Sequence, residues 1–282
     1  MSLLMLAGPA LSSGAVYLWD AGDGTDDNWT TAANWESDIV PIDDGTAEVI
    51  FAEGDGLVEV DVARNVAAIA GNNPFNGTLI YGQQVTVGAG GIACNDSAGL
   101  EMTASVVLNA NQTFNAADGP LAFDILHLGP YTLSITGGSD VYCISSVVEG
   151  AGSISKTGTG YLFLNGLLHF SALTTSAGTT VLESPLPGAT ITNNGGTLSL
   201  EANNTSSTLN ANSGTTSISD DQTLVGLNIG GSAVVSIHGS TPAQAIPEPD
   251  VVGLLSAGAL CFLGKCRWAR RRAILQHHRP PR

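Results

Sequence analysis

Basic residues are almost missing from the first 250 residues of this 282-residue chain. All 25 acidic residues lie there, and only Arg64 and Lys156 oppose them, which leaves residues 1–250 with a net charge of −23. Proteins that bind nucleic acid need a basic surface to neutralise phosphates. We therefore expect no nucleic-acid binding by this part of the chain.

Segments with helical periodicity are also nearly absent before residue 250, and charged residues make up only 12% of the chain. Glycine, in contrast, is abundant, with 35 residues. A chain that is rich in glycine and poor in charge and helical patterning is typical of an all-β protein with many turns. Its length allows one or two domains and a sizeable core.

Glycines precede short β-type runs at a regular spacing in the second half of the chain. Gly160, Gly178, Gly196 and Gly214 follow one another at intervals of 18 positions, and Gly231 comes 17 positions later. A period near 18 is too short for a repeat of two helices and fits one coil of a parallel β-helix, whose stacked coils bury each other's apolar side chains. The prediction is an all-β solenoid over residues 58–239, with a β-sandwich as the alternative fold.

Apolar runs continue this pattern toward the N-terminus with less regular spacing. Roughly ten coils at about 4.8 Å per layer would give a rod on the order of 50 Å long. On that geometry Cys94 and Cys143 lie about 13 Å apart, too far for a disulfide, so both are expected to be buried free thiols. The strands expected before the regular repeats are 58–62, 78–81, 85–87, 106–108, 121–128, 131–135 and 141–148.

The segment from residue 1 to residue 57 differs from the rest in composition. Residues 1–15 hold a short apolar run followed by small residues, which predicts a secretory signal peptide, although no lysine or arginine precedes the run. Residues 16–57 contain Trp19, Trp29 and Trp35, which are suited to covering the exposed first layer of a solenoid as a cap. Stacking of sugars on an exposed aromatic face is the alternative role for these tryptophans.

Four acidic side chains in the same segment are candidate calcium ligands, because hard cations bind oxygen. They are Asp20, Asp23, Asp26 and Asp27. Their spacing does not match an EF-hand loop, so we interpret them as solvated turn residues and expect no metal site.

After residue 240 the composition changes abruptly. Residues 240–250 form a proline-containing linker, and an apolar segment follows. Over residues 251–268 this segment would make a helix of about 27 Å, which predicts a single transmembrane helix; an amphipathic surface helix and a buried helix are the alternatives. Residues 269–282 would be a basic cytoplasmic tail. The residues expected to retain the helix in the membrane are Lys265, Arg267, Arg270, Arg271 and Arg272.

The order of these features resembles a PEP-CTERM sorting signal. Pro247, Glu248 and Pro249 are followed by the apolar segment and then by the arginine cluster. In that family a membrane enzyme, exosortase, is thought to cut near the Pro-Glu-Pro motif and to release or transfer the exported protein. The resemblance implies a bacterial envelope protein with exosortase as a partner, often from organisms that make extracellular polysaccharide.

The body resembles the autotransporter-associated β-strand repeat, also called the passenger-associated transport repeat. The similarity lies in residues 150–166, with the sequence GAGSISKTGTGYLFLNG, and continues in residues 176–182. The tryptophan-rich start is similar to the opening of such proteins. The resemblance implies a right-handed parallel β-helix on a bacterial surface.

No arrangement of residues in the body predicts catalysis. β-Helix lyases and hydrolases need convergent acidic residues, often with arginine, lysine or calcium, and the body has only two basic side chains. His127, His169 and His238 have no cysteine or histidine partner at ligand spacing and are interpreted as isolated. The acidic residues close in sequence, interpreted as turn or surface residues, are Asp118 with Asp124 and Asp220 with Asp221.

These features predict an exported, non-enzymatic protein of the bacterial cell surface or extracellular matrix, with a structural or adhesive role. It would be processed at its C-terminal sorting signal, be anchored transiently in the inner membrane, and need no cofactor. Extracellular polysaccharide is a candidate partner. The alternative is a secreted β-helix polysaccharide lyase or hydrolase, or a carbohydrate-binding protein.

Overall fold

The structure is a computed structural model, and its described residues belong to the first of two compact units, Met1–Thr241 and Pro242–Arg282. Most of the predicted signal peptide, the Pro-Glu-Pro motif, the predicted transmembrane helix and the basic tail lie outside the described residues. Within the described part, no helix has the length and apolar character that a membrane crossing requires. The described residues are 14–52, 56–73, 76–219 and 221–238.

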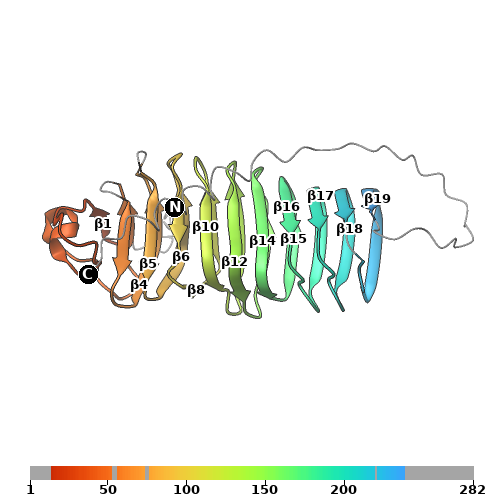
Figure 1. Cartoon of the computed structure of the whole chain (residues 1–282), viewed down its shortest axis with the longest axis horizontal. Coiled ribbons are helices and arrows are strands. Elements are labelled where there is room, and N and C mark those ends of the chain that lie inside the picture. The colour runs from red at the N-terminus through yellow and green to blue at the C-terminus, as the bar shows by residue number, and fades with distance from the viewer. Residues whose placement is uncertain (1–13, 53–55, 74–75, 220, 239–282) are drawn as a thin grey trace, which may run out of the picture. The chain divides into compact units, whose positions relative to one another are not determined.

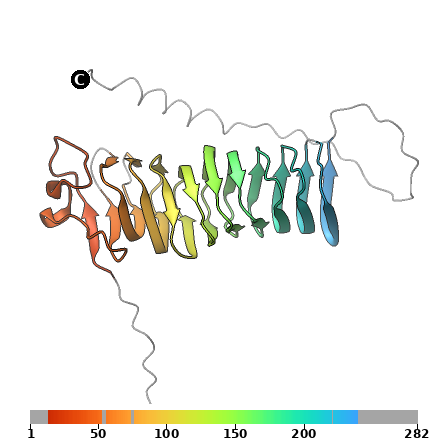
Figure 2. The same ribbon diagram turned by 90° about the horizontal axis from the view of Figure 1, so that it is seen from below.

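The first unit is an all-β solenoid of parallel strands (Figure 1). The strands follow one another along the stack broadly in chain order, which is also visible after a quarter turn (Figure 2). Two short 3₁₀ helices, η1 (Ala32–Asn34) and η2 (Glu36–Asp38), lie between β1 and β2. The strands are β1 (Val16–Trp19), β2 (Glu48–Phe51), β3 (Leu57–Val60), β4 (Arg64–Gly71), β5 (Thr78–Gly82), β6 (Val85–Cys94), β7 (Leu100–Met102), β8 (Val106–Leu108), β9 (Gln112–Ala116), β10 (Leu121–His127), β11 (Thr132–Gly137), β12 (Val141–Glu149), β13 (Ser153–Lys156), β14 (Tyr161–His169), β15 (Ala172–Thr175), β16 (Thr179–Leu182), β17 (Thr190–Leu200), β18 (Thr208–Ile218) and β19 (Gly226–Ile237).

The strands pair into three parallel sheets, and the longer strands turn a corner from one sheet into the next. The first sheet contains β1, β2, β9, β11, β13 and β15, the second halves of β4 and β6, and the first halves of β17, β18 and β19. The second contains β3, β5, β7 and β16, the first halves of β10, β12 and β14, and the second halves of β17, β18 and β19. The third contains β8, the first halves of β4 and β6, and the second halves of β10, β12 and β14.

The predicted period of 18 is confirmed. Partners in the first sheet are 18 positions apart from Thr175 to Ile229. Between β2 and β13 the coils are longer, with partners 20 to 23 positions apart, which explains the less regular pattern in that part of the sequence. Within the described residues, the second sheet has ten strands from β3 to β19 and therefore spans nine complete turns, close to the roughly ten layers predicted.

Glycines at one corner of the regular coils stack directly on one another. Gly196 and Gly214 both have a φ of 74°, and a Cβ atom on Gly196 would lie 2.5 Å from the carbonyl oxygen of Gly178. Both the conformation and the close approach therefore require glycine. The predicted last member of the series is wrong, because Gly214 pairs with Ala233 rather than with Gly231. The spacing of 17 between Gly214 and Gly231 predicted a shorter final coil, but at this corner the final coil is longer than the regular coils before it.

Alternate residues of each strand point into the solenoid and form continuous interior rows. In the first sheet, one row passes through Phe114 and Ile135, and both side chains are buried. The same row continues through Lys156, Thr175 and Asn193, which are also buried. Along this one row, the interior side chains thus change from apolar to polar as the coils become shorter.

Three tryptophans close the N-terminal end of the stack. Trp19, Trp29 and Trp35 are at most 1% exposed and pack with Phe51, with ring centroids 5.0 to 6.2 Å apart. Trp35 Nε1 donates a hydrogen bond to the carbonyl oxygen of Trp29 at 2.7 Å. Because the rings are buried against one another, they present no exposed aromatic face to a sugar.

The two cysteines of the body are buried and free, as predicted. Cys94 belongs to the first sheet and Cys143 to the second, in different coils. Burial raises the pKa of the Cys94 thiol to about 11 and that of Cys143 to about 12. Both thiols therefore stay protonated at neutral pH, where only the thiolate would react.

The third sheet stops after β14 because prolines occupy the next position. The N–H of Gly166 donates to Oγ of Ser184 at 2.8 Å, which places the segment after β16 beside β14. Pro185 and Pro187 follow in that segment, and neither has the N–H group that a continuing ladder would need.

In the last coils, side-chain hydrogen bonds join neighbouring coils on the side where the third sheet would continue. Asn204 is buried, and its Oδ1 accepts the N–H of Leu186 at 2.9 Å while its Nδ2 donates to Oε1 of Gln222 at 3.0 Å. Ser207, also buried, donates to the carbonyl oxygen of Leu186 at 2.6 Å. These bonds join neighbouring coils, as the backbone ladder does in the earlier part of the solenoid.

Candidate functional site

The residues predicted to carry the sorting function lie outside the described residues. They are Pro247, Glu248, Pro249, Lys265, Arg267, Arg270, Arg271 and Arg272. Among the described residues, the candidate site is on the outer face of the third sheet, over its last strands.

Two histidines and a glutamate stack on this outer face, and we call them the His–Glu–His ladder. His127 of β10 pairs with Glu149 of β12, and Glu149 pairs with His169 of β14. All three point outward because the residue before each of them is buried in the core. They therefore occupy three successive coils, at about 4.8 Å per layer.

The first two members of the ladder are in direct contact. His127 Nδ1 and Glu149 Oε1 are 2.8 Å apart, and the two side chains are 35% and 46% exposed. A pair this exposed contributes only about 0–1 kcal/mol to stability, and it becomes an ion pair only when the imidazole is protonated. Its main consequence is orientation, since it holds the imidazole toward the carboxylate on the next coil.

An apolar row runs beside the ladder on the same three strands. Ile125, Val147 and Leu167 are paired with one another two residues before the ladder positions. Leu167, at the end of the row, is 63% exposed. The outer face of the third sheet thus offers parallel polar and apolar rows along the axis of the stack.

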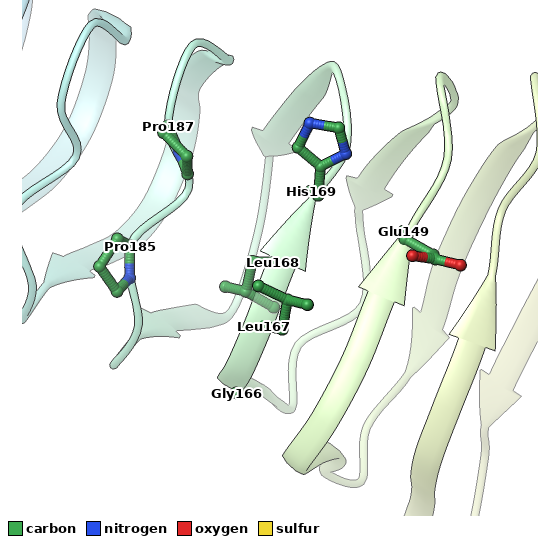
Figure 3. Close-up of a pocket in the computed structure, with 7 residues that line it drawn as sticks. All are labelled: Glu149, Gly166, Leu167, Leu168, His169, Pro185 and Pro187. Atoms are coloured by element: carbon green, nitrogen blue, oxygen red, sulfur yellow. The ribbon is translucent and has the colours of Figure 1, made fainter.

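Two open hollows meet at the end of these rows and form what we call the third-sheet groove. One, of about 330 Å³, lies between the end of β14 and the coil that carries Pro185 and Pro187 (Figure 3). The other, of about 460 Å³, lies over the ladder itself. Glu149 and His169 line both. The remaining lining residues are Gly166, Leu167 and Leu168 in the first hollow and His127, Gly129, Gly150 and Ala151 in the second.

The groove exists because the third sheet ends where it does. A further strand after β14 would cover the side of that strand, whereas the proline segment leaves an opening beside Leu167 and His169. The glutamate accepts hydrogen bonds and the imidazoles can donate or accept them. Within the described ranges, no three histidine, cysteine, aspartate or glutamate side chains are placed to hold a metal ion. The arrangement suits recognition of hydroxyl groups on an extended ligand.

The interpretation of His127 as isolated is wrong, because its imidazole contacts Glu149, whereas His169 shares the outer face with that pair through strand register. His127 and His169 lie 22 and 20 positions from Glu149, and each of these spacings is one coil of the longer kind. The period of 18 in the later coils does not bring these residues together, which is why the ladder was missed. A coil spacing of 20 to 23 positions, applied to this part of the sequence, is the signal that finds it.

Acidic residues near the N-terminal end of the stack accept hydrogen bonds within turns. Asp23 accepts the N–H groups of Thr25 and Asp26, both at 3.1 Å, and Asp26 accepts the N–H of Asn28 at 2.9 Å. The hydrogen bond from the Asn28 backbone is the largest cause of the lowered pKa of Asp26. These contacts are those of turn residues.

The basic and acidic residues considered for catalysis do not gather in the groove. Lys156 is 1% exposed, and its Nζ donates to the carbonyl oxygen of Gly158 inside the solenoid. Burial lowers the pKa of Lys156, and the Asp140 carboxylate opposes that shift. Neither Asp118 nor Asp124 lines the groove. Arg64 and Asp221 do not line it either, His238 is exposed just after β19, and Asp220 lies outside the described residues.

Comparison with protein-family models, with curated proteins and with solved structures found no match for this chain. The parallel solenoid is consistent with autotransporter-type β-strand repeats. The similarity to a PEP-CTERM signal depends on the tail sequence alone.

Proposed function

We propose that this chain is an exported bacterial protein of the cell surface or extracellular matrix, with a structural or adhesive role. The observation that carries the proposal is the uninterrupted solenoid of nine turns. Such a stack has a continuous core and a long outer surface, which suits extended contacts better than a closed active site does. β-Solenoids are typical of surface, adhesin and carbohydrate-active proteins.

The tail sequence supports export and sorting. Exosortase would read Pro247, Glu248 and Pro249, while the helix predicted over 251–268 holds the chain in the inner membrane. The basic residues that follow would keep the tail on the cytoplasmic side, with the acidic body outside. We also propose that the coils wind right-handed, as the general rule for parallel crossovers predicts.

The sorting role is tested by replacing Pro247, Glu248 and Pro249 with alanine in the full chain, produced in its own host. We expect the full-length form to accumulate in the membrane, because the processing enzyme no longer recognises it. Replacing Ser240, Thr241 and Pro242 with alanine is the matched control in the same linker. Unchanged processing of the first variant would refute the motif's role.

A carbohydrate-binding role is the second candidate, and the third-sheet groove favours it. The groove pairs a carboxylate and two imidazoles with an exposed leucine, so it offers both hydrogen bonds and apolar contact to a saccharide. Residues 16–240 can be screened against uronic acid polymers, with and without calcium. We expect saturable binding that weakens in Glu149→Gln and His169→Ala but not in His238→Ala. Turnover that is lost in Glu149→Gln would instead assign an enzyme.

A further inference from the structure

The last coil of the solenoid exposes side chains that are buried one coil earlier. Leu209 in β18 is 0% exposed, but Leu227, its partner in β19, is 46% exposed. Ile218 is 4% exposed, and its partner Ile237 is 69% exposed. These are core positions that open to solvent because the described residues provide no further coil. We call this surface, residues 225–237, the end face.

The backbone of the end face is also open on one side. β19 is a 12-residue strand that pairs with β18, and among the described residues it has no strand on its other edge. Open edges are normally protected by charged residues, proline or a covering segment. From Gln222 to Ile237 the sequence contains no charged residue and no proline. The end face therefore has the properties of an interface.

The opposite end of the stack differs in this respect. Buried Trp19, Trp29 and Trp35 cover the core there, so the N-terminal end cannot receive the end face of another copy by continuing the core. Head-to-tail association into a filament is thereby disfavoured. Two copies that meet through the same face form a closed pair related by a two-fold axis.

The charge of the body favours association of two copies through the end face over association along their flanks. Residues 1–250 carry a net charge of −23, so two bodies repel each other along their flanks. Contact through the end face, which contains no charged residue, keeps the acidic side chains of the two bodies farther apart than contact along their flanks would. The sequence that follows contains Pro242, Pro247 and Pro249, which lack the N–H group that a strand pairing with β19 would use.

We propose that a second copy of this chain docks on the end face, so that two solenoids join end to end. The two β19 strands then pair antiparallel across the two-fold axis, and the exposed core positions Leu227, Ile229 and Ile237 become buried. This inference does not depend on the sorting signal or on saccharide binding. It concerns the assembly that the solenoid itself forms.

Sedimentation of the full-length chain, in a detergent matched to the solvent density, tests the proposal. We expect twice the mass of one chain, and at least tenfold weaker association in Ile229→Lys and, separately, in Ile237→Lys. Val62→Lys is the matched control, because Val62 is 53% exposed and lies outside the end face. Thermal unfolding followed by circular dichroism checks that each variant keeps its fold.

Three results would overturn the proposal. One is a monomer at protein concentrations on the order of 100 μM, which would imply at best very weak association. Another is a dimer that both lysine variants leave intact. The third is a monomer whose β19 amides are protected from hydrogen exchange until residues 242–282 are removed, which would assign the end face to the chain's own tail.

Discussion

Up to β14 the solenoid has three sheets, whereas from β16 onward it has two sheets and a third side without strands. We call these the three-sheet part and the two-sheet part. Partners in the first sheet are 20 to 23 positions apart between β2 and β13 and 18 positions apart from β15 onward. The two parts thus reach the same stacking with coils of different length.

Their interiors differ as well. In the three-sheet part, Phe114 stacks on Phe123 with ring centroids 4.9 Å apart. In the two-sheet part, Asn193 and Thr216 are buried, and Asn193 Nδ2 donates to Oγ1 of Thr216 at 3.1 Å. Apolar packing fills the wider coils, and polar side chains that satisfy one another fill part of the narrower ones.

Side-chain hydrogen bonds join successive coils in both parts, for example from Thr136 to Asn115 across 21 positions and from Asn95 to Asn72 across 23 positions in the three-sheet part. In the two-sheet part, asparagine pairs keep the period of 18. Asn212 Nδ2 donates to Oδ1 of Asn194 at 2.8 Å, and Asn228 Nδ2 donates to Oδ1 of Asn210 at 2.7 Å, each across 18 positions. Such a bond needs donor and acceptor at the same place in both coils, because its geometry is narrow. Apolar contacts tolerate extra turn residues, since they have no direction.

The largest loss of stability is expected from a cavity in the core of the three-sheet part. Phe114→Ala removes a fully buried ring, and we expect it to lower the free energy of unfolding by about 3–5 kcal/mol. Urea unfolding of residues 16–241 measures it. A loss below about 1 kcal/mol would mean that this core relaxes around the cavity, against the packing described above.

A smaller loss is expected at the glycine corner of the two-sheet part. Gly196→Ala combines a positive φ with the clash against Gly178, and we expect a loss of about 2–3 kcal/mol. Gly188→Ala has a similar φ of 72° but open space, so it should lose only about 1 kcal/mol. Equal losses for the two variants, measured by urea unfolding, would show that close stacking is not what requires glycine.

The side-chain hydrogen bonds that replace the third sheet give the next effect. Asn204→Ala leaves the N–H of Leu186 buried without its acceptor, and we expect a loss of about 2 kcal/mol. Asn212→Ala, on the exposed surface, should change stability by less than about 0.5 kcal/mol. Equal stability of the two variants in thermal unfolding would show that the hydrogen bonds of Asn204 do not stabilise the side of the coils that lacks strands.

The smallest effect is a gain at Lys156, where the interior row becomes polar. Burial lowers the pKa of Lys156 below its ordinary value of 10.5. At pH values between the lowered pKa and 10.5, the Lys156 side chain is protonated in the unfolded chain but not in the folded chain. The free energy of unfolding therefore rises with pH in that interval. Lys156→Met should therefore stabilise the protein by about 1 kcal/mol at pH 7, and the gain should shrink as the pH approaches 10.5. A gain that is independent of pH, in unfolding experiments from pH 7 to 10.5, would contradict this assignment.

Part of the fold could be predicted from the sequence. The spacing of 18 and the apolar runs identify the solenoid and most of its strands, because stacking requires equivalent residues in every coil. The strands that these patterns do not identify include β1, β2, β4, β7, β9 and β15. Alanine and glycine make up much of β4, and β9 contains polar residues, so only their place in the stack makes them strands.

The candidate site was less accessible to sequence reasoning. His127, Glu149 and His169 come together only once the longer coil length is known. The end of the third sheet follows from Pro185 and Pro187, but their effect depends on β14 lying beside them. Local sequence patterns do not predict these contacts, because the contacts depend on which residues of neighbouring coils are paired.

Mass spectrometry of the mature protein, recovered from the envelope and medium of cells that produce the full chain, tests the proposed function most directly. We expect an N-terminus near residue 16 and a C-terminus near residues 247–249. An intact chain from residue 1 to residue 282 in the soluble cytoplasmic fraction would contradict both export and sorting.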